Sequence, residues 1–202
     1  MSIVPRRAAT GARGALAPIA RALHRSGVSA NAVTLAGLVI TLVGALLVAL
    51  GQPAAAFVVL LAGALADTLD GQIALLAGGG TKLGAFLDST FDRLSDAALS
   101  VAALIAGAFH GEPLLFFSAI LALVAGSLVP YVRAKAESLG ITASVGLAPR
   151  EARLVLMVLG IAAWAATGSL SLFAAAVAVV ALLSTITAAQ RIAHVAHALR
   201  NT

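Results

Sequence analysis

Six long apolar stretches, separated by short polar breaks, constrain the fold of this chain more than any other feature. They cover approximately residues 32–51, 54–77, 82–109, 113–138, 149–167 and 170–198. A helix needs about 20 predominantly apolar residues to cross the hydrocarbon core of a bilayer. The breaks contain Gly and Pro, as in Gly51-Gln52-Pro53, which end helices and turn the chain. The pattern predicts an all-α integral membrane bundle of six transmembrane helices, formed by residues 1–202 as a single domain.

The composition agrees with a protein surrounded by lipid. The chain is 61% hydrophobic and 10% charged, whereas soluble domains average about 45–50% apolar and about 25% charged residues. There is no cysteine, which excludes disulfides and thiolate metal sites. The net charge of +5 does not predict binding to nucleic acid, because the basic residues flank apolar stretches and lack interleaved aromatic residues. Attraction to the anionic headgroups of membrane lipids is the better interpretation.

The distribution of Lys and Arg predicts the orientation in the membrane. Basic residues precede the first stretch, lie around the second and fourth connections, and end the chain, while the first, third and fifth turns have none. The positive-inside rule makes the basic side cytoplasmic. With six spans, both termini and any site on that side are cytoplasmic. We therefore expect a multi-pass protein of the plasma membrane.

Residues 4–26 precede the first stretch and have a different pattern. On a helical projection, Leu16, Ile19 and Leu23 occupy one arc, and the basic residues share roughly a third of the circumference. This predicts an amphipathic helix lying in the membrane interface, kinked at Pro18. The basic positions are Arg6, Arg7, Arg13, Arg21, His24 and Arg25.

Carboxylates inside the second and third stretches are the main functional signal. Each costs about 2.5–3.5 kcal/mol at the centre of a bilayer, and nearby basic groups are too few to pair with all of them. Spacings of i, i+3 and i, i+4 place each pair on one helix face, and both pairs lie roughly 10–16 Å below the cytoplasmic helix ends. Oxygen ligands favour Mg²⁺ or Mn²⁺. The residues are Asp67, Asp70, Asp88 and Asp92, with Asp96 one turn further on.

Two other interpretations apply to these carboxylates. A structural ion-pair network is one, and the ion site of a divalent-cation transporter is the other. Against a transporter, the carboxylates cluster in the cytoplasmic half of the predicted bundle, and the outer halves contain no acidic residue that would continue an ion path.

The spacing of these residues resembles the signature of the CDP-alcohol phosphotransferase family, D-x2-D-G-x2-A-R-x8-G-x3-D-x3-D. Seven of its eight fixed positions match, at Asp67, Asp70, Gly71, Ala74, Gly84, Asp88 and Asp92. The resemblance implies a cytoplasmic cavity, usually in a homodimer, in which two divalent metal ions, Mg²⁺ or Mn²⁺, hold the diphosphate of a CDP-linked lipid. It implies that Asp67, Asp70 and Asp88 are metal ligands and that Asp92 is both a ligand and the general base.

The same resemblance implies which residues bind the nucleotide. Asp67 and the small residues Gly71, Ala74 and Gly84 lie on this side of the site. Asn31 and Thr34 match a nucleotide-side pattern, P-D/N-x2-T, although Ala30 replaces its Pro. Leu75 occupies the position of the signature Arg, so a cation expected near the nucleotide is missing. The metal ions alone, or Arg93 or Lys82, are candidates to supply that charge; an altered active site is the alternative.

Other segments resemble the actinobacterial phosphatidylinositol-phosphate synthases of this family. The resemblance implies transfer of the phosphatidyl group from CDP-diacylglycerol to inositol 1-phosphate in phospholipid biosynthesis, with release of CMP. It implies that Arg133, Arg153 and Arg191 bind the acceptor phosphate, with Arg replacing Lys at the first position. Glycerol 3-phosphate is the alternative acceptor, and simple positive-inside decoration is the alternative role for these arginines. The matching segments are Gly78–Gly84, Leu87–Asp96, Tyr131–Glu137, Arg153-Leu154 and Gln190-Arg191.

Overall fold

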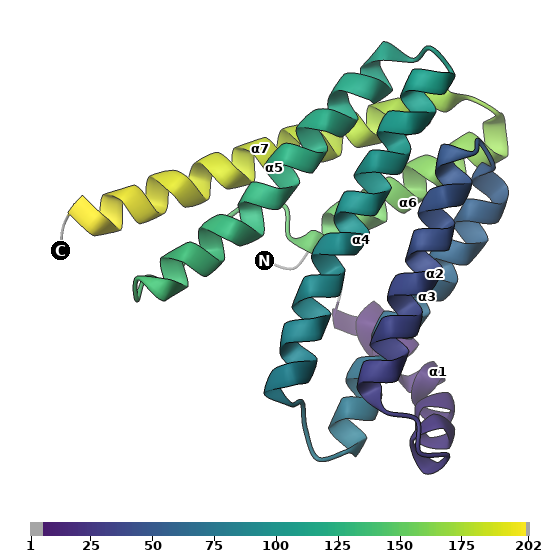
Figure 1. The fold of residues 1–202 in the computed structure, drawn as a ribbon, viewed down its shortest axis with the longest axis vertical. Helices are drawn as coiled ribbons and strands as arrows, with labels where there is room; N and C mark the ends of the chain where they lie inside the picture. Colours follow the sequence, from purple (N-terminus) through teal and green to yellow (C-terminus); the bar gives the residue numbers. More distant parts are fainter. Residues whose placement is uncertain (1–5, 201–202) are drawn as a thin grey trace.

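The computed structural model of the chain describes residues 6–200, and their side chains from Gly14 onward. All regular secondary structure in this described part is helical (Figure 1), which confirms the all-α prediction. The helices that follow α1 agree with the six predicted stretches to within two residues at each end. The helices are α1 (Arg6–Arg25), α2 (Ala30–Ala49), α3 (Pro53–Leu76), α4 (Lys82–Phe109), α5 (Pro113–Ser138), α6 (Arg150–Thr167) and α7 (Leu170–Arg200).

Four of the described helices, α2, α3, α5 and α7, are long and apolar enough to cross a membrane by length and composition. The sequence predicts six transmembrane helices, α2 to α7. Helices α4 and α6 have 28 and 18 residues, so length is not what separates them from the other four. Helix α4 carries Asp88, Asp92 and Asp96, and α6 begins with Arg150 and Arg153. The charged residues of the predicted site therefore lower the hydropathy of these two helices.

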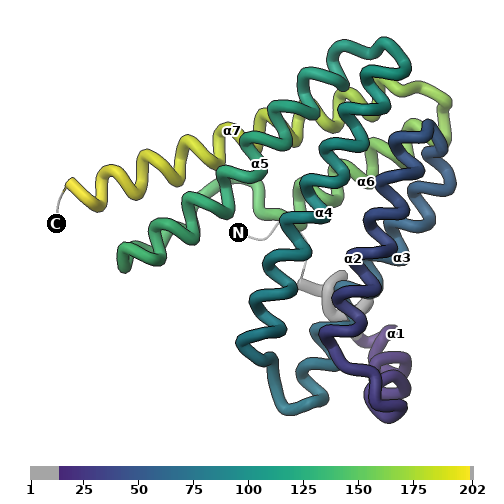
Figure 2. Tube along the Cα trace, viewed as in Figure 1, coloured from purple at the N-terminus to yellow at the C-terminus, as the bar shows by residue number. Residues whose placement is uncertain are grey.

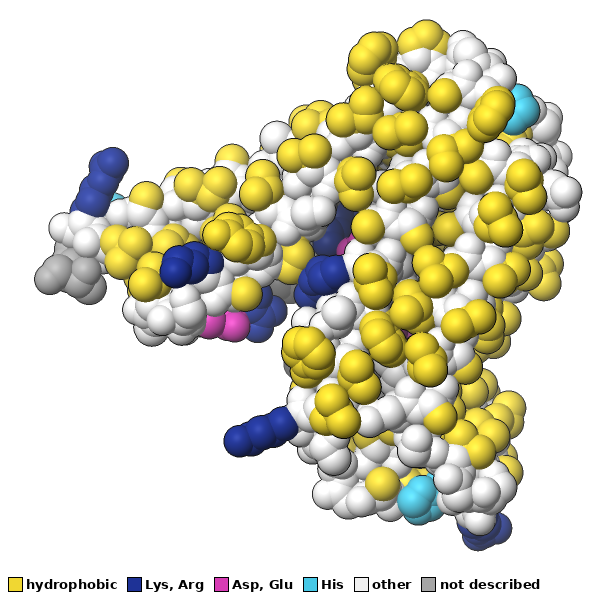
Figure 3. All heavy atoms as spheres, in the orientation of Figure 1, with side chains coloured by type: hydrophobic (Ala, Val, Ile, Leu, Met, Phe, Trp, Pro, Cys, Tyr) yellow, Lys and Arg dark blue, Asp and Glu magenta, His cyan; other side chains and the backbone are white. Residues whose placement is uncertain are grey.

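The helices form two arms that meet at one end and diverge at the other (Figures 1 and 2). In the first arm α2 packs against both α3 and α4, and in the second α5 packs against α7. Helix α4 joins the arms through α5, and α6 joins them by packing against α3 and α7. Figure 3 shows hydrophobic side chains spread over both arms, with basic and acidic side chains in the hollow between them. Charged groups are thus gathered where the arms diverge.

Small residues bring the helices of the core close together. Ala56, Ala103 and Ala119 are fully buried in the main apolar cluster, which extends over α2 to α7. The ring of Trp164 on α6 stacks on that of Phe173 on α7, with centroids 5.9 Å apart. Close packing of small residues is the usual way in which helices associate in lipid.

Helix α1 is attached to the first arm by a second, smaller cluster. Ala20 of α1, Val33 of α2 and Ile73 of α3 are buried there, with Leu23 packed against them. Pro18 lies inside the helix. The side chains of Arg6, Arg7 and Arg13, which the predicted amphipathic pattern uses, lie outside the described residues. The cluster fixes the end of α1 beside the start of α2 and the end of α3.

Candidate active site

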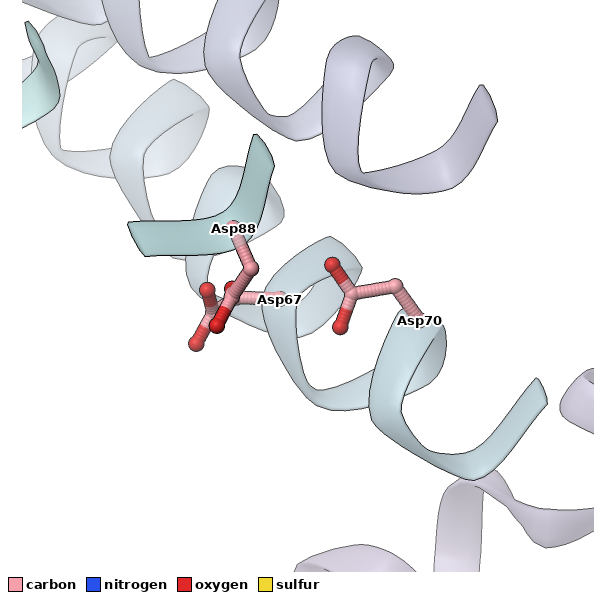
Figure 4. A group of neighbouring side chains, drawn as sticks. All are labelled: Asp67, Asp70 and Asp88. Atoms are coloured by element: carbon pink, nitrogen blue, oxygen red, sulfur yellow. The ribbon is translucent and has the colours of Figure 1, made fainter. Parts of the chain in front are cut away.

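Three of the four signature carboxylates converge between α3 and α4. Asp67, Asp70 and Asp88 each place one oxygen within 4.8 Å of the others (Figure 4). Helices α3 and α4 both pack against α2, so α2 sets the distance at which these side chains meet. The i, i+3 spacing of Asp67 and Asp70 brings both to the same face of α3.

The chemistry of this group fits a divalent cation. Asp70 is only 8% exposed, and its Oδ2 is buried without a hydrogen-bond partner among the described residues. A buried carboxylate oxygen without a partner is costly, and a cation removes that cost. Mg²⁺ and Mn²⁺ prefer oxygen ligands of this kind. Asp67, Asp70 and Asp88 are therefore the residues that fit a metal ion in this structure.

A cavity of about 650 Å³ opens beside the three carboxylates. Six of the seven residues predicted for nucleotide binding line it. A Cβ atom at Gly71 would meet no atom within 4 Å, so this glycine leaves open space in the cavity. A Cβ at Gly84 would lie 3.1 Å from Asn31 Oδ1, so a glycine lets α4 approach α2. The six lining residues are Asn31, Thr34, Asp67, Gly71, Ala74 and Gly84.

The seventh predicted nucleotide residue, Leu75, is located elsewhere. Its side chain is 77% exposed, and Leu75 is not among the described residues that line the cavity. Ala74 faces the cavity, and the next residue of a helix is rotated by about 100°. Proximity in sequence to the lining residues therefore does not bring Leu75 into this cavity.

Lys82 and Arg93 are the sequence candidates for the cation that Leu75 does not provide. Neither is among the described residues lining the nucleotide-side cavity, and Arg93 lines a different cavity between α4 and α5. The lining does contain His24, from the end of α1. The sequence signal for this residue is its basic character on α1, which by itself predicts contact with lipid headgroups.

The fourth signature carboxylate, Asp92, lies next to the other three and makes an ion pair instead. Its Oδ1 is 2.9 Å from Nη1 of Arg150, and its Oδ2 is 3.9 Å from Nη1 of Arg93. Asp92 shares a small cavity of about 80 Å³ with Asp67, Asp70 and Arg150. The structure thus brings the predicted base to the edge of the predicted metal site, with a guanidinium bound to it.

The ion-pair network continues from Asp92 along α4. Nε of Arg150 lies 3.2 Å from Asp96 Oδ1, and Nη2 of Arg153 lies 3.5 Å from Asp96 Oδ2. Arg153 is 7% exposed, and its Nη1 has no partner among the described residues. Asp96 also lines the cavity of about 380 Å³ between α4 and α5. The network therefore connects the signature carboxylates to the hollow between the arms.

The three arginines predicted to bind the acceptor phosphate come from α5, α6 and α7. Arg133 is exposed and pairs with Glu137 at 2.8 Å. Arg191 donates from Nε to the carbonyl of Val145 at 2.9 Å and from Nη1 to that of Val129 at 2.7 Å. Arg133 and Arg153 both lie close enough to Arg191 to repel it electrostatically. Cations gathered in this way favour an anionic ligand.

The fold and this site define the class of the protein. Residues 28–193 match the family model described as CDP-alcohol phosphatidyltransferase. The chain belongs to this family, which confirms the resemblance seen in the signature.

Two relatives show which members of the family the chain resembles. The chain is 39% identical over 145 residues to the phosphatidylinositol phosphate synthase of Mycolicibacterium smegmatis, covering 71% of this chain and 65% of that protein, which is less than two thirds of its length. It is 38% identical over 136 residues to the archaetidylinositol phosphate synthase of Methanothermobacter thermautotrophicus, covering 67% of each.

Solved structures resemble the whole fold. The crystal structure of Mycobacterium tuberculosis phosphatidylinositol phosphate synthase with CDP-DAG bound matches with a TM-score of 0.82 and 34% identity, over 89% of this chain and 92% of that chain. The structure of the same synthase with manganese and citrate matches with a TM-score of 0.82 and 34% identity, over 88% of this chain and 87% of that one.

Proposed function

We propose that this protein is a phosphatidylinositol-phosphate synthase, which transfers the phosphatidyl group of CDP-diacylglycerol to inositol 1-phosphate and releases CMP. The observation that carries the proposal is the convergence of Asp67, Asp70 and Asp88 at the wall of a cavity of about 650 Å³. Ligand pockets of roughly 300–1,000 Å³ bind small molecules. Relatives named phosphatidylinositol phosphate synthase and archaetidylinositol phosphate synthase support this choice of acceptor.

The nucleotide end of the CDP-lipid occupies this cavity in the proposed assignment. Asp67, Asp70 and Asp88 hold divalent metal, Mg²⁺ or Mn²⁺, with two ions expected and Asp92 as a further ligand. When bound, such ions neutralise the diphosphate and the leaving CMP. The manganese in the tuberculosis synthase structure and the CDP-DAG in another support both parts of the assignment.

Asp92 acts as the general base. The acceptor hydroxyl gives its proton to the Asp92 carboxylate while its oxygen forms a bond to the phosphorus of the phosphatidyl group. The bond from that phosphorus to the CMP oxygen breaks. A positioned base contributes about 10²–10⁴-fold to a reaction of this kind. The position of Asp92, between the metal-site residues and the hollow lined by Asp96, supports this role.

The acceptor phosphate binds in the hollow between the arms, to Arg133, Arg153 and Arg191. A phosphomonoester carries close to two negative charges at neutral pH, and such an anion would offset the repulsion of Arg191 by Arg133 and Arg153. Glycerol 3-phosphate carries the same group and is the alternative acceptor. If these arginines only follow the positive-inside rule, no phosphate site is expected here.

The membrane arrangement completes the proposal. All six helices from α2 to α7 cross the bilayer of the plasma membrane, α1 lies in the interface, and both termini and the active site face the cytoplasm. Helices α4 and α6 tolerate charged residues because these residues pair within the protein, as Arg150 does with Asp92 and Asp96. We carry the homodimer over from the family resemblance.

The test is release of CMP from CDP-diacylglycerol by the purified protein with a panel of acceptors. Inositol 1-phosphate should be used best, and glycerol 3-phosphate, free inositol and serine should be poorer. Asp92→Asn should lose turnover while still binding CDP. Preference for glycerol 3-phosphate would change the acceptor and keep the class. Ion flux through reconstituted protein without any CMP release would favour the transporter.

A further inference from the structure

The nucleotide-side cavity has an uneven distribution of charge. Three of the described residues that line it are aspartates, and His24 is the one described lining residue whose side chain can carry a positive charge. The imidazole is also a hydrogen-bond donor in both its neutral and its charged form. Hydrogen bonds from a donor or cation to phosphate oxygens are strong, and His24 provides such a group on the α1 side of this cavity.

From this arrangement we infer that His24 binds the diphosphate of the CDP-lipid from the α1 side of the cavity. This side carries a group that can be positively charged, whereas the side formed by α3 and α4 carries the three carboxylates. The inference rests on the proposed function, because it takes a cytidine diphosphate as the ligand. It gives α1 a role in substrate binding in addition to its role at the membrane surface. The chemical class of the ligand is a nucleoside diphosphate ester.

The backbone around His24 is fixed by a helix-ending motif. Gly27 has a φ of 81°, in the left-handed region that favours glycine. Its N–H donates to the carbonyl of His24 at 3.1 Å, and the N–H of Val28 donates to the carbonyl of Leu23 at 3.1 Å. This pair of bonds is the Schellman motif, which includes an apolar contact, and Leu23 and Val28 both pack against the small apolar cluster.

Packing against α3 holds this helix end beside the cavity. Ala20, one turn before His24, is 1% exposed, and it shares a buried cluster with Ile73, which is also 1% exposed. Ile73 itself lines the cavity. The register between α1 and α3 is therefore set directly next to the site, which is the condition for a side chain on α1 to meet a ligand reproducibly.

Other basic residues near α1 provide matched comparisons. Arg25 follows His24 directly, and Arg21 lies three residues before it, yet neither is among the described residues that line the cavity. If basic charge in the interface were the only requirement, Arg25 would serve as well as His24. If the cavity binds the diphosphate as we infer, His24 alone of these three should affect it.

The experiment measures binding of CDP, without a lipid tail, to the full-length protein in detergent with saturating Mg²⁺. His24→Ala should weaken CDP binding about 3- to 10-fold, the range for losing one hydrogen bond. His24→Gln keeps an N–H donor and should retain most of the affinity. Arg25→Ala should bind CDP as the unchanged protein does. Binding of Mn²⁺ without CDP should be the same in all four proteins, because His24 is not a ligand.

The possible outcomes are distinct. Equal CDP affinity in His24→Ala and the unchanged protein would overturn the inference, as would an equal loss in Arg25→Ala. A changed dependence of activity on anionic lipid in mixed micelles, with CDP affinity intact, would assign His24 to headgroups and overturn it too. Failure of the unchanged protein to bind CDP at all would instead contradict the proposed function.

Discussion

Arg150 binds Asp92 across the space between α6 and α4, with Nη1 2.9 Å from Oδ1. The same guanidinium places Nε 3.2 Å from Asp96 Oδ1. One side chain thus holds two carboxylates that lie one turn apart on α4. A planar guanidinium does this with two different nitrogens in a fixed geometry, whereas a lysine ammonium is a single point charge without such a fork. The side chain that fixes the orientation of the proposed base therefore comes from a different helix.

We predict that Arg150→Ala lowers turnover at least tenfold with little change in the KM for CDP-diacylglycerol, because a base that loses its fixed geometry loses part of its roughly 10²–10⁴-fold contribution. Arg150→Lys should not restore turnover. The Arg150 and Asp92 side chains are about a fifth exposed, so the cost in stability should be about 1–3 kcal/mol, below the range for fully buried pairs.

The stability control is Arg133→Ala, which breaks an exposed pair with Glu137 and should cost under about 1 kcal/mol. Unfolding in detergent and paired saturation curves measure these effects. Normal turnover in Arg150→Ala would show that Asp92 does not depend on this contact.

The metal site makes a separate prediction. Asp67→Asn, Asp70→Asn and Asp88→Asn should each weaken binding of Mn²⁺, since affinity depends on the number of charged ligands. The loss should be roughly tenfold or more, as even residues that only orient a ligand contribute 10–100-fold. Titration of Mn²⁺ into each purified variant measures this directly. Glu112→Gln, at the opposite end of the bundle, is the control. Activity that survives a chelator would falsify the metal assignment.

Local sequence signals were sufficient for the helices and for the carboxylate group. Pro53 and Pro113 stand at the first positions of α3 and α5, where proline is favoured. Gly168 ends α6 in the left-handed conformation, as a helix C-cap requires. The convergence of Asp67 and Asp88 followed from helical spacing and from one short turn between antiparallel helices. These features depend on residues that are near in sequence.

Features that depend on distant residues were not predictable in the same way. The closer ion-pair partner of Asp92, Arg150, is 58 residues away, and the pairing depends on how α6 packs against α3. His24 reaches the cavity because Ala20 packs with Ile73, a contact that no local pattern shows. Leu75 occupies the position of the signature Arg but is exposed and lies outside the described lining of the cavity, since conserved spacing does not fix the direction of a side chain that departs from the signature.

The acceptor pocket is tested most cleanly at Arg133, whose ion pair with Glu137 is exposed, so that its loss should not disturb the fold. Arg133→Ala should raise the KM for inositol 1-phosphate about 10-fold, at the lower end of the 1.5–3 kcal/mol expected for a bond to a charged group. The KM for CDP-diacylglycerol should change much less. Lys135→Ala, at the same end of α5, is the matched control. Equal shifts in both KM values, or an equal effect of Lys135→Ala, would indicate that these basic residues only set the orientation in the membrane and bind no phosphate.

The six-span arrangement predicts where reporter domains are found. Fusions after residue 202 and near Gly79 should report the cytoplasm, and fusions near Gln52 and Gly168 should report the opposite side. The reason is the one-sided distribution of Lys and Arg. Because α4 and α6 are less apolar than the other four helices, fusions near Gly111 and Gly140 are the informative ones. Six crossings place Gly111 outside and Gly140 in the cytoplasm, whereas crossings by α2, α3, α5 and α7 alone reverse both. A periplasmic C-terminus would contradict the model with six crossings.

Substitutions at two glycines test the role of the cavity in nucleotide binding separately from the role of helix packing in stability. A Cβ atom at Gly71 meets no atom within 4 Å and enters the nucleotide-side cavity, whereas one at Gly160 would lie 2.6 Å from Ala176 Cβ and 3.0 Å from the ring of Phe173. Gly71→Ala should therefore keep or raise stability, by up to about 1 kcal/mol from helix propensity, and should raise the KM for CDP-diacylglycerol. Gly160→Ala should cost about 1–3 kcal/mol through overpacking, with both KM values unchanged in the protein that remains folded.

Thermal unfolding in detergent and saturation curves for both substrates distinguish the two effects. Unchanged affinity for CDP and for CDP-diacylglycerol in Gly71→Ala would show that the nucleotide binds elsewhere than in this cavity.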